Sequence, residues 1–397
     1  MLESGIMGAM IVKASKMKIL MLNYEFPPIG GGAGNANLCL LKEYAGNSEL
    51  TVDILTSGAR PGFFEEKLAE NITIYRVGVH KKDLHFWRKV EVIEWLVKAG
   101  PHYRRLVRQR DYDLAHAFFG FPTGYLCLRT ANKLPYIISL RGSDVPGEHA
   151  RLKIDYKILG PVFKRIWRRA SLLVACSEGL RERALRFLPD VSIDVIPNGV
   201  DLERFYPAEA GARREMLRLL TVGRLSVTKR VDMLINAVEI LRKEGVKAQL
   251  TIVGSGALEQ QLRQSISQKG LGEVIEMTGR VDAEEMPRLY RQSDVLVSAT
   301  MQEGMSNAML EAMASGLPIV TTRCEGVEEL VADNGIVVEG AGGEVIAGAV
   351  KKIAQDREGY RRMSEAARNR ANSFTWSSVA DRYIRHYRQI VQNKQGR

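Results

Sequence analysis

The sequence has few cysteines and no long apolar run, and both absences narrow what the protein can be. Its four cysteines are Cys39, Cys127, Cys176 and Cys324, which form neither a CxxC pair nor a disulfide-like spacing. A disulfide scaffold and a cysteine-ligated metal site are therefore not expected, and the compartment is expected to be reducing, hence cytoplasmic. No stretch of 18 apolar residues exists, so no transmembrane helix is predicted.

The start of the chain lacks the order of a signal peptide. Residues 1–16 do not show a positively charged segment followed by an apolar segment and a cleavage site. An apolar, strand-like run begins at Met17. We therefore expect residues 1–16 to be a disordered N-terminal extension, and Met17 to open the first strand.

Length and charge indicate two domains and an anionic partner. A chain of 397 residues is too long for one typical core. Residues 1–206 hold 30 Lys and Arg against 22 Asp and Glu, a balance of +8 within the total of +11. A basic first half fits a membrane surface or a phosphate-bearing acceptor. A solvated basic surface with no partner is an equally good interpretation.

Apolar runs alternate with helical patterns along the whole chain, which predicts an α/β fold with parallel sheets. We expect Rossmann-like domains at 17–206 and 207–375 and a closing helical segment at 376–397. Ligands of such open sheets bind at the carboxyl ends of the strands. The predicted strands are 18–23, 51–56, 72–77, 113–117, 135–139, 172–176, 193–196, 219–222, 249–253, 274–277, 294–298, 318–321 and 336–338.

The segment 303–320 carries the clearest chemical pattern. Ser306 is the expected N-cap of a short helix that follows a strand and ends at Gly316. The free backbone N–H groups of Met305, Ser306, Asn307 and Ala308 would then bear a partial positive charge suited to a phosphate. Glu303 lies before this helix and Glu311 lies within it. An anion site between two hydroxyl-accepting carboxylates is what a sugar nucleotide requires, although an isolated pair of glutamates would more often be merely solvated.

Two further segments fit the same ligand. The loop Gly30 to Gly34 follows the first strand and opens a helix, so Gly31 and Gly32 can approach a phosphate closely. Arg224 and Lys229 leave the first strand of the second half and can converge on one anion. The Gly254–Gly256 stretch lacks the third glycine of a dinucleotide fingerprint, because position 259 is Glu.

Taken together, these ordered segments resemble the retaining glycosyltransferases of family 4, also described as glycosyl transferases group 1. The resemblance spans residues 17–391 and rests on 303–320, the GR-x4-K pattern at 224–229 and the glycine loop. It implies the GT-B fold, in which two Rossmann-like domains face each other across a cleft and the last helix crosses back to the first domain. This chain has Arg230 where the family commonly has glycine.

The resemblance also implies a role for each donor-side residue. Arg224 and Lys229 would grip the diphosphate, Glu303 would orient the donor sugar, and Glu311 would bind the ribose. The stretch that ends at Val281 would read the nucleotide base. The implied donor-binding set is Gly31, Gly32, Arg224, Lys229, Val281, Glu303, Met305, Ser306, Asn307, Ala308 and Glu311.

The acceptor side is less well defined by the sequence. Asp144 lies in Ser-Leu-Arg-Gly-Ser-Asp, where many relatives carry His-Gly-x-Asp, so Arg141 replaces the usual histidine. Asp144 is a catalytic candidate that would reach a sugar hydroxyl, or else it caps the following turn. His116 is a candidate for the acceptor cleft, although a lone histidine beside aromatics is more often structural.

Residues 157–169 read as a basic amphipathic helix. Its aromatic face contains Phe163 and Trp167, and Arg165, Arg168 and Arg169 lie among the basic residues. Such a helix can lie on an anionic membrane. Packing of its aromatic face into the first core is the other use, and it is the more common one.

The resemblance implies transfer of a sugar from a UDP- or GDP-sugar to an acceptor hydroxyl with retention at the anomeric carbon. Catalytic candidates are Arg224, Lys229, Glu303 and Asp144, with no metal, no cofactor and no nucleic acid. The expected acceptor is a saccharide or a lipid-linked saccharide of envelope polysaccharide or glycolipid synthesis, handled in the cytoplasm and at the inner membrane face. A soluble small-molecule acceptor, or a nucleotide-sugar epimerase of the same fold, remains the alternative.

Overall fold

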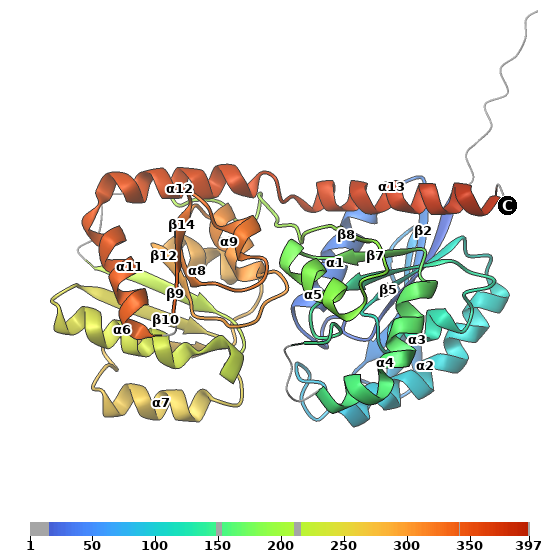
Figure 1. The fold of residues 1–397 in the computed structure, drawn as a ribbon, viewed down its shortest axis with the longest axis horizontal. Helices are drawn as coiled ribbons and strands as arrows, with labels where there is room; N and C mark the ends of the chain where they lie inside the picture. Colours follow the sequence, from blue (N-terminus) through green and yellow to red (C-terminus); the bar gives the residue numbers. More distant parts are fainter. Residues whose placement is uncertain (1–15, 148–152, 210–215, 341, 396–397) are drawn as a thin grey trace, which may run out of the picture.

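The computed structural model describes residues 16–147, 153–209, 216–340 and 342–395 (Figure 1). Residues 1–15 of the predicted extension at 1–16 lie outside these residues. Within them the chain forms an eight-stranded sheet in its first half and a six-stranded sheet in its second half. The strand order of the first sheet is β3-β4-β2-β1-β5-β6-β7-β8, and that of the second is β11-β10-β9-β12-β13-β14. These two Rossmann-like sheets confirm the α/β fold class.

The first sheet is parallel apart from one edge strand. Its centre is fully buried at Ile19 and Leu20 because helices cover both faces. Its strands are β1 Met17–Asn23, β2 Leu50–Gly58, β3 Phe63–Ala69, β4 Ile72–Gly78, β5 Leu114–Phe118, β6 Tyr136–Leu140, β7 Leu172–Ala175 and β8 Ile193–Val195. Its helices are α1 Gly32–Tyr44, α2 Lys89–Gln109, α3 Thr123–Leu128, α4 Lys153–Arg169 and α5 Glu178–Phe187.

Strand β3 is the one element of this sheet that the sequence analysis missed. It runs antiparallel to β4 at the sheet edge, and Glu65 to Lys67 face solvent. Edge strands commonly carry exposed charges, and these charges replace the apolar alternation that marks a strand in the sequence.

The second sheet is parallel throughout the described ladders. Its strands are β9 Leu217–Val222, β10 Ala248–Val253, β11 Ile275–Gly279, β12 Val295–Ser298, β13 Ile319–Thr322 and β14 Gly335–Val338. The helical segments are η2 Val227–Lys229, α6 Val231–Lys243, α7 Glu259–Gln268, α8 Met286–Gln292, α9 Asn307–Ala314, α10 Val327–Leu330, α11 Gly343–Gln355 and α12 Arg357–Ala371. All six predicted strands of this half are confirmed, with bounds shifted by at most two residues.

The last helix returns to the first half of the chain. Helix α13 (Trp376–Gln395) continues from α12 and lies along the first sheet's side of the molecule (Figure 1). It packs against α1, where the Tyr44 and Tyr387 hydroxyls lie 3.1 Å apart. Tyr383 hydrogen-bonds Ser139 of β6 at 2.7 Å. The predicted crossing of the closing helix is thus confirmed, and it braces the first half against the second.

Among the residues that the structure describes, none of the helices is both long and apolar enough to span a membrane.

Candidate active site

Helix α9 places its N-terminus at the cleft as the sequence predicted. Strand β12 ends at Ser298, a loop follows, and the Ser306 side chain accepts a hydrogen bond from the Met309 N–H. This cap uses one of the four N–H groups that a helix start leaves without partners. Ser306 and Ala308 line a small cleft at the carboxyl ends of β9, β10 and β12. The helix start therefore faces a space that an anion can enter.

Arg224 and Lys229 line this same cleft, so the two cations lie in one place, and their convergence on one anion stays a prediction. Lys229, in η2, forms an ion pair with Glu303 from the loop before α9. Both side chains are about a quarter exposed, at 25% and 23%. The sequence placed these two residues in one site without pairing them. A partly exposed pair of this kind can exchange partners with an incoming phosphate at little cost.

Glu311 is half-buried on α9. The Tyr290 hydroxyl donates a hydrogen bond of 2.8 Å to its carboxylate. Burial raises the pKa of Glu311 to about 7, and the Tyr290 hydrogen bond opposes that rise. Tyr290 was not identified from the sequence, because it lies on α8, 21 residues away from Glu311.

Arg230 adopts a backbone conformation that explains why relatives use glycine there. Its φ is 44°, in the left-handed region that residues with a Cβ rarely adopt. Its guanidinium donates to the Ala299 carbonyl at 2.7 Å and to the Thr322 hydroxyl at 3.2 Å. Arg230 therefore ties the ends of β12 and β13 to the loop that carries Lys229. These two hydrogen bonds fix the position of the loop.

The glycine loop of the first half faces this site from the other side of the cleft. A side chain at Gly31 would lie 3.7 Å from an Arg224 nitrogen, and one at Gly32 would lie 3.4 Å from the Asn307 amide. Gly34 packs so closely on Glu25 that a Cβ would come within 2.8 Å of its carbonyl oxygen. The fold of the loop thus needs glycine at Gly34, whereas Gly31 and Gly32 face Arg224 and Asn307 at ordinary contact distances.

Glu25 is a neighbour of the cleft that the sequence analysis missed. Burial raises the pKa of its half-buried carboxyl, while Arg224 and the Gly31 N–H favour the charged form. Its sequence context, Asn-Tyr-Glu-Phe-Pro-Pro, gave no sign of this role. The one indication in the sequence was that Glu25 comes shortly after the first strand, at the sheet edge where ligands bind.

Asp144 is held by backbone groups. Its carboxylate accepts hydrogen bonds from the Gly120 N–H at 2.7 Å and the Arg141 N–H at 2.8 Å. Burial raises its pKa, and these N–H donors oppose that rise. The geometry shows the turn-holding role, and contact with a sugar hydroxyl remains a prediction.

Arg141 connects the two halves through Asn198, and its predicted place on the acceptor side stays a prediction. Its guanidinium stacks 4.3 Å from the Phe118 ring centre and donates to the Asn198 side chain at 2.8 Å. The Asn198 amide donates in turn to the Asn307 side chain at 2.8 Å. Arg141 and Asn198 thereby position the first residue of α9. Asn198 was missed because its sequence segment reads as an ordinary turn.

The structure places His116 in the core, so its candidate position in the acceptor cleft is wrong and the structural alternative is confirmed. Its side chain is fully buried on β5, where the ring nitrogens hydrogen-bond Ser139 at 2.7 Å and Tyr387 at 2.6 Å. Burial, reinforced by nearby Arg141, lowers the pKa of His116 to about 3. The residue is a neutral core group that helps to dock α13, which the sequence could not show because Tyr387 lies 271 residues away.

Two other predicted segments have clear positions. Phe163, Ile166 and Trp167 of α4 are buried in the first core, so the aromatic face of that helix does not form a membrane surface. Val281 follows β11 and is half-buried, and its part in reading a base remains a prediction.

The comparisons with known proteins agree with this architecture. A model described as Glycosyltransferase Family 4 matches residues 30–204, and one described as Glycosyl transferases group 1 matches residues 204–370. The chain belongs to the family 4, group 1 glycosyltransferases of the GT-B type, and it is accordingly a glycosyltransferase.

Individual relatives cover nearly the whole chain. An uncharacterised glycosyltransferase of Methanocaldococcus jannaschii is 25% identical over 96% of this chain and 100% of its own length. Sucrose-phosphate synthase of Thermosynechococcus elongatus superposes with a TM-score of 0.82 at 20% identity, over 95% of this chain and 100% of that structure. The HepE protein of Anabaena, solved with UDP and glucose, superposes with a TM-score of 0.70 at 18% identity, over 93% and 99%.

Proposed function

We propose that the protein transfers a sugar from a nucleotide diphosphate sugar to an acceptor hydroxyl with retention at the anomeric carbon. The observation that carries this proposal is the meeting of Arg224, Lys229 and the N-terminus of α9 at one cleft. All three favour negative charge, and a diphosphate gains negative charge as the bond to the sugar breaks. The HepE structure with UDP and glucose supports the donor class. The proposed donor is a UDP- or GDP-sugar.

Each residue of the cleft then has a distinct task. Lys229 leaves Glu303 and binds the diphosphate, which frees the Glu303 carboxylate to accept hydrogen bonds from the donor sugar. Arg224 provides a second, forked cation. Glu311 accepts hydrogen bonds from the ribose. Charge stabilisation of this kind contributes most when the groups are already fixed in place.

Retention follows from a same-face route. The acceptor hydroxyl approaches the anomeric carbon on the face from which the diphosphate departs, and a phosphate oxygen takes the hydroxyl proton. A double-displacement route would instead need two carboxylates about 5 Å apart. In this proposal the freed Glu303 carboxylate accepts hydrogen bonds from the donor sugar and Asp144 is held by backbone N–H groups, so neither is assigned as a nucleophile. Because protein cations balance the diphosphate, the proposed reaction is independent of a metal ion.

The proposed acceptor is a saccharide, most specifically a lipid-linked saccharide of envelope polysaccharide or glycolipid synthesis at the cytoplasmic membrane face. Residues 1–206 carry +8 of the net +11, which supports an anionic or membrane-bound acceptor on that half. A soluble small-molecule acceptor is the alternative, and activity on free sugars in the absence of any lipid would favour it.

Thermal unfolding with a panel of nucleotides tests the donor site. UDP or GDP at a hundredfold excess over Kd should stabilise the protein by about 2.7 kcal/mol. The shift should persist in EDTA, because the phosphate partners are protein groups. Loss of the shift in EDTA would contradict metal independence. If no nucleoside diphosphate gave a shift, the proposal of a donor site in this cleft would be wrong.

A further inference from the structure

Helix α2 exposes an apolar stripe on its outer face. Val90, Ile93 and Val97 are 66%, 55% and 66% exposed and lie at helical spacing on one side of the helix. Leu84 and Phe86, in the loop that leads into α2, are 40% and 39% exposed. These are five of the twelve large apolar residues that are exposed in the part of the chain that the structure describes, and they lie within 14 consecutive positions.

This stripe is not explained by packing within the chain. The opposite face of α2 already buries Trp95, Tyr103 and Leu106, and the helix packs on β2, β4 and α3. A surface helix normally directs polar residues outward. A contiguous apolar face on the outside of such a helix marks an interaction surface.

The same surface is strongly basic. Residues 80–110 contain nine Lys or Arg and three Asp or Glu, a net charge of +6 within 31 residues. Arg104 and Arg108 continue the exposed stripe toward the end of α2. An apolar stripe bordered by arginines matches an anionic lipid surface, since the apolar groups enter the headgroup layer and the cations meet the phosphates.

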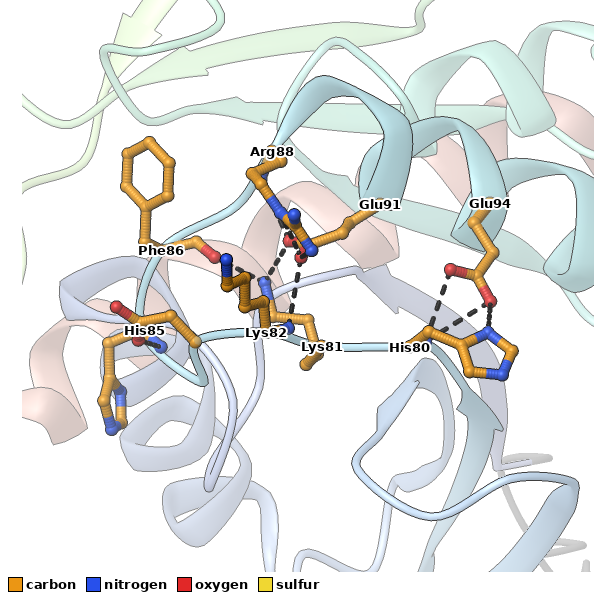
Figure 2. Close-up of polar contacts among 9 residues, drawn as sticks. His80, Lys81, Lys82, His85, Phe86, Arg88, Glu91 and Glu94 are labelled. Atoms are coloured by element: carbon orange, nitrogen blue, oxygen red, sulfur yellow. Dashed lines mark hydrogen bonds and ion pairs between the residues drawn. The ribbon is translucent and has the colours of Figure 1, made fainter.

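Two of the acidic residues of this region are already neutralised. Glu91 is buried and pairs with Lys81 at 2.7 Å and with Arg88 at 2.7 Å. Glu94 contacts His80 at 2.6 Å (Figure 2) and Lys98 at 2.6 Å. Figure 2 also shows the ring of Phe86 directed away from the Lys81–Glu91 pair. The pairing fixes the loop before α2 and leaves the outward charge of the face positive.

We propose that the face formed by Leu84, Phe86, Val90, Ile93 and Val97, with Arg104 and Arg108 at its end, docks on an anionic lipid bilayer. This α2 face replaces the predicted surface at residues 157–169, whose aromatic residues are buried. The inference rests on the proposed function, because a lipid-linked acceptor requires the enzyme to work at a membrane.

The α2 face is joined directly to the donor cleft. The Gly30 N–H donates to the Leu84 carbonyl at 2.8 Å, and His85 hydrogen-bonds the Gly30 carbonyl at 2.8 Å. The loop that contacts the bilayer therefore also holds the glycine loop, which faces Arg224. Docking through this face brings the membrane surface to the first-domain side of the cleft.

Vesicle sedimentation of the full chain tests the proposal. The vesicles contain neutral phosphatidylcholine alone or mixed about three to one with anionic phosphatidylglycerol. Wild-type protein should pellet with the anionic vesicles at low salt and be released as salt rises. Ile93→Gln with Val97→Gln should reduce binding at least tenfold, and Arg104→Gln with Arg108→Gln should reduce it and flatten its salt dependence. Ile158→Gln, which alters a 70% exposed apolar residue of α4, is the matched control and should bind like wild type.

Nucleotide stabilisation of the same variants separates the possible failures. All variants should retain the wild-type thermal shift, which shows that they are folded and that the donor site is intact. Nucleotide binding without pelleting of the wild type would overturn the docking proposal alone. Pelleting without any nucleotide shift would overturn the proposed donor site alone. If the wild type sediments as a dimer that Ile93→Gln dissociates, and vesicles are not bound, the α2 face is an interface between two copies and the proposal is wrong.

Discussion

The two sides of the cleft use charged residues in opposite ways. On the second-half side, Arg224, Lys229 and Glu303 lie at the cleft, and the one pair they form is partly exposed. On the first-half side, His116 is buried and Asp144 is held by backbone N–H groups. The donor side is therefore charged and ready to exchange partners. On the other side, His116 and Asp144 are fixed by hydrogen bonds, and much of the net positive charge of that half lies in residues 80–110.

The largest expected effect comes from removing a donor-side cation. Arg224→Ala or Lys229→Ala should lower kcat/KM for the donor by about 10²–10³, the range seen when one fixed charge partner of a transition state is lost. Steady-state kinetics with the donor that gives the largest thermal shift measures this. Lys243→Ala removes a 72% exposed lysine of α6 and should leave kcat/KM unchanged. Wild-type turnover in both cleft variants would show that the diphosphate binds elsewhere.

The two donor-side glutamates should separate kinetically. Glu303→Ala should chiefly lower kcat, since the proposed role of Glu303 is to orient the reacting sugar. Glu311→Ala should chiefly raise the Kd of the nucleotide, by about 10-fold to 10²-fold, because a hydrogen bond to a charged group is lost. Nucleotide titration together with kcat determines both values. The same kinetic profile in both variants would refute this division of roles.

The pH dependence of nucleotide binding should report on Glu311. The pKa of about 7 leaves most of this carboxyl neutral at pH 6 and ionised at pH 8. If the ionised form binds the ribose, affinity should rise about tenfold between these pH values. Calorimetric titration measures the change, and Glu311→Gln should abolish it.

The stability of the empty protein should change in the opposite sense. The folded pKa of Glu311 lies above its unfolded value, so its contribution to stability is full below the unfolded pKa and is lost as pH rises through about 7. Unfolding of the empty wild type and of Glu311→Gln across this range should therefore differ in slope. Parallel curves would show that Glu311 titrates normally.

The smallest effect on activity is expected from a substitution of the buried His116. His116→Ala leaves the buried Ser139 and Tyr387 hydroxyls short of a partner, which should cost about 1–3 kcal/mol of unfolding free energy. Its KM for an acceptor should stay at the wild-type value. Urea unfolding and acceptor kinetics test the two halves of this prediction. A raised KM with unchanged stability would indicate that His116 does take part in acceptor binding.

The same contrast explains what could be predicted from the sequence. Ser306, Arg224 and Lys229 were placed correctly because each lies in a short loop at a strand end, where local pattern determines position. Tyr290 and Asn198 were missed because their partners are distant in the chain, and side-chain packing creates those contacts. Strand β3 was missed because the charged residues Glu65 to Lys67 interrupt the apolar alternation that indicates a strand.

Donor hydrolysis tests the central claim most directly, because it requires no knowledge of the acceptor. The protein is incubated with the nucleotide sugar that stabilises it most, and the released sugar is followed by proton NMR before its anomers equilibrate. Wild-type protein should release the sugar in the anomeric configuration of the donor, and Lys229→Ala should release it about 10²–10³ times more slowly. First appearance of the opposite anomer would contradict retention, and a sugar altered at another carbon would indicate an epimerase instead.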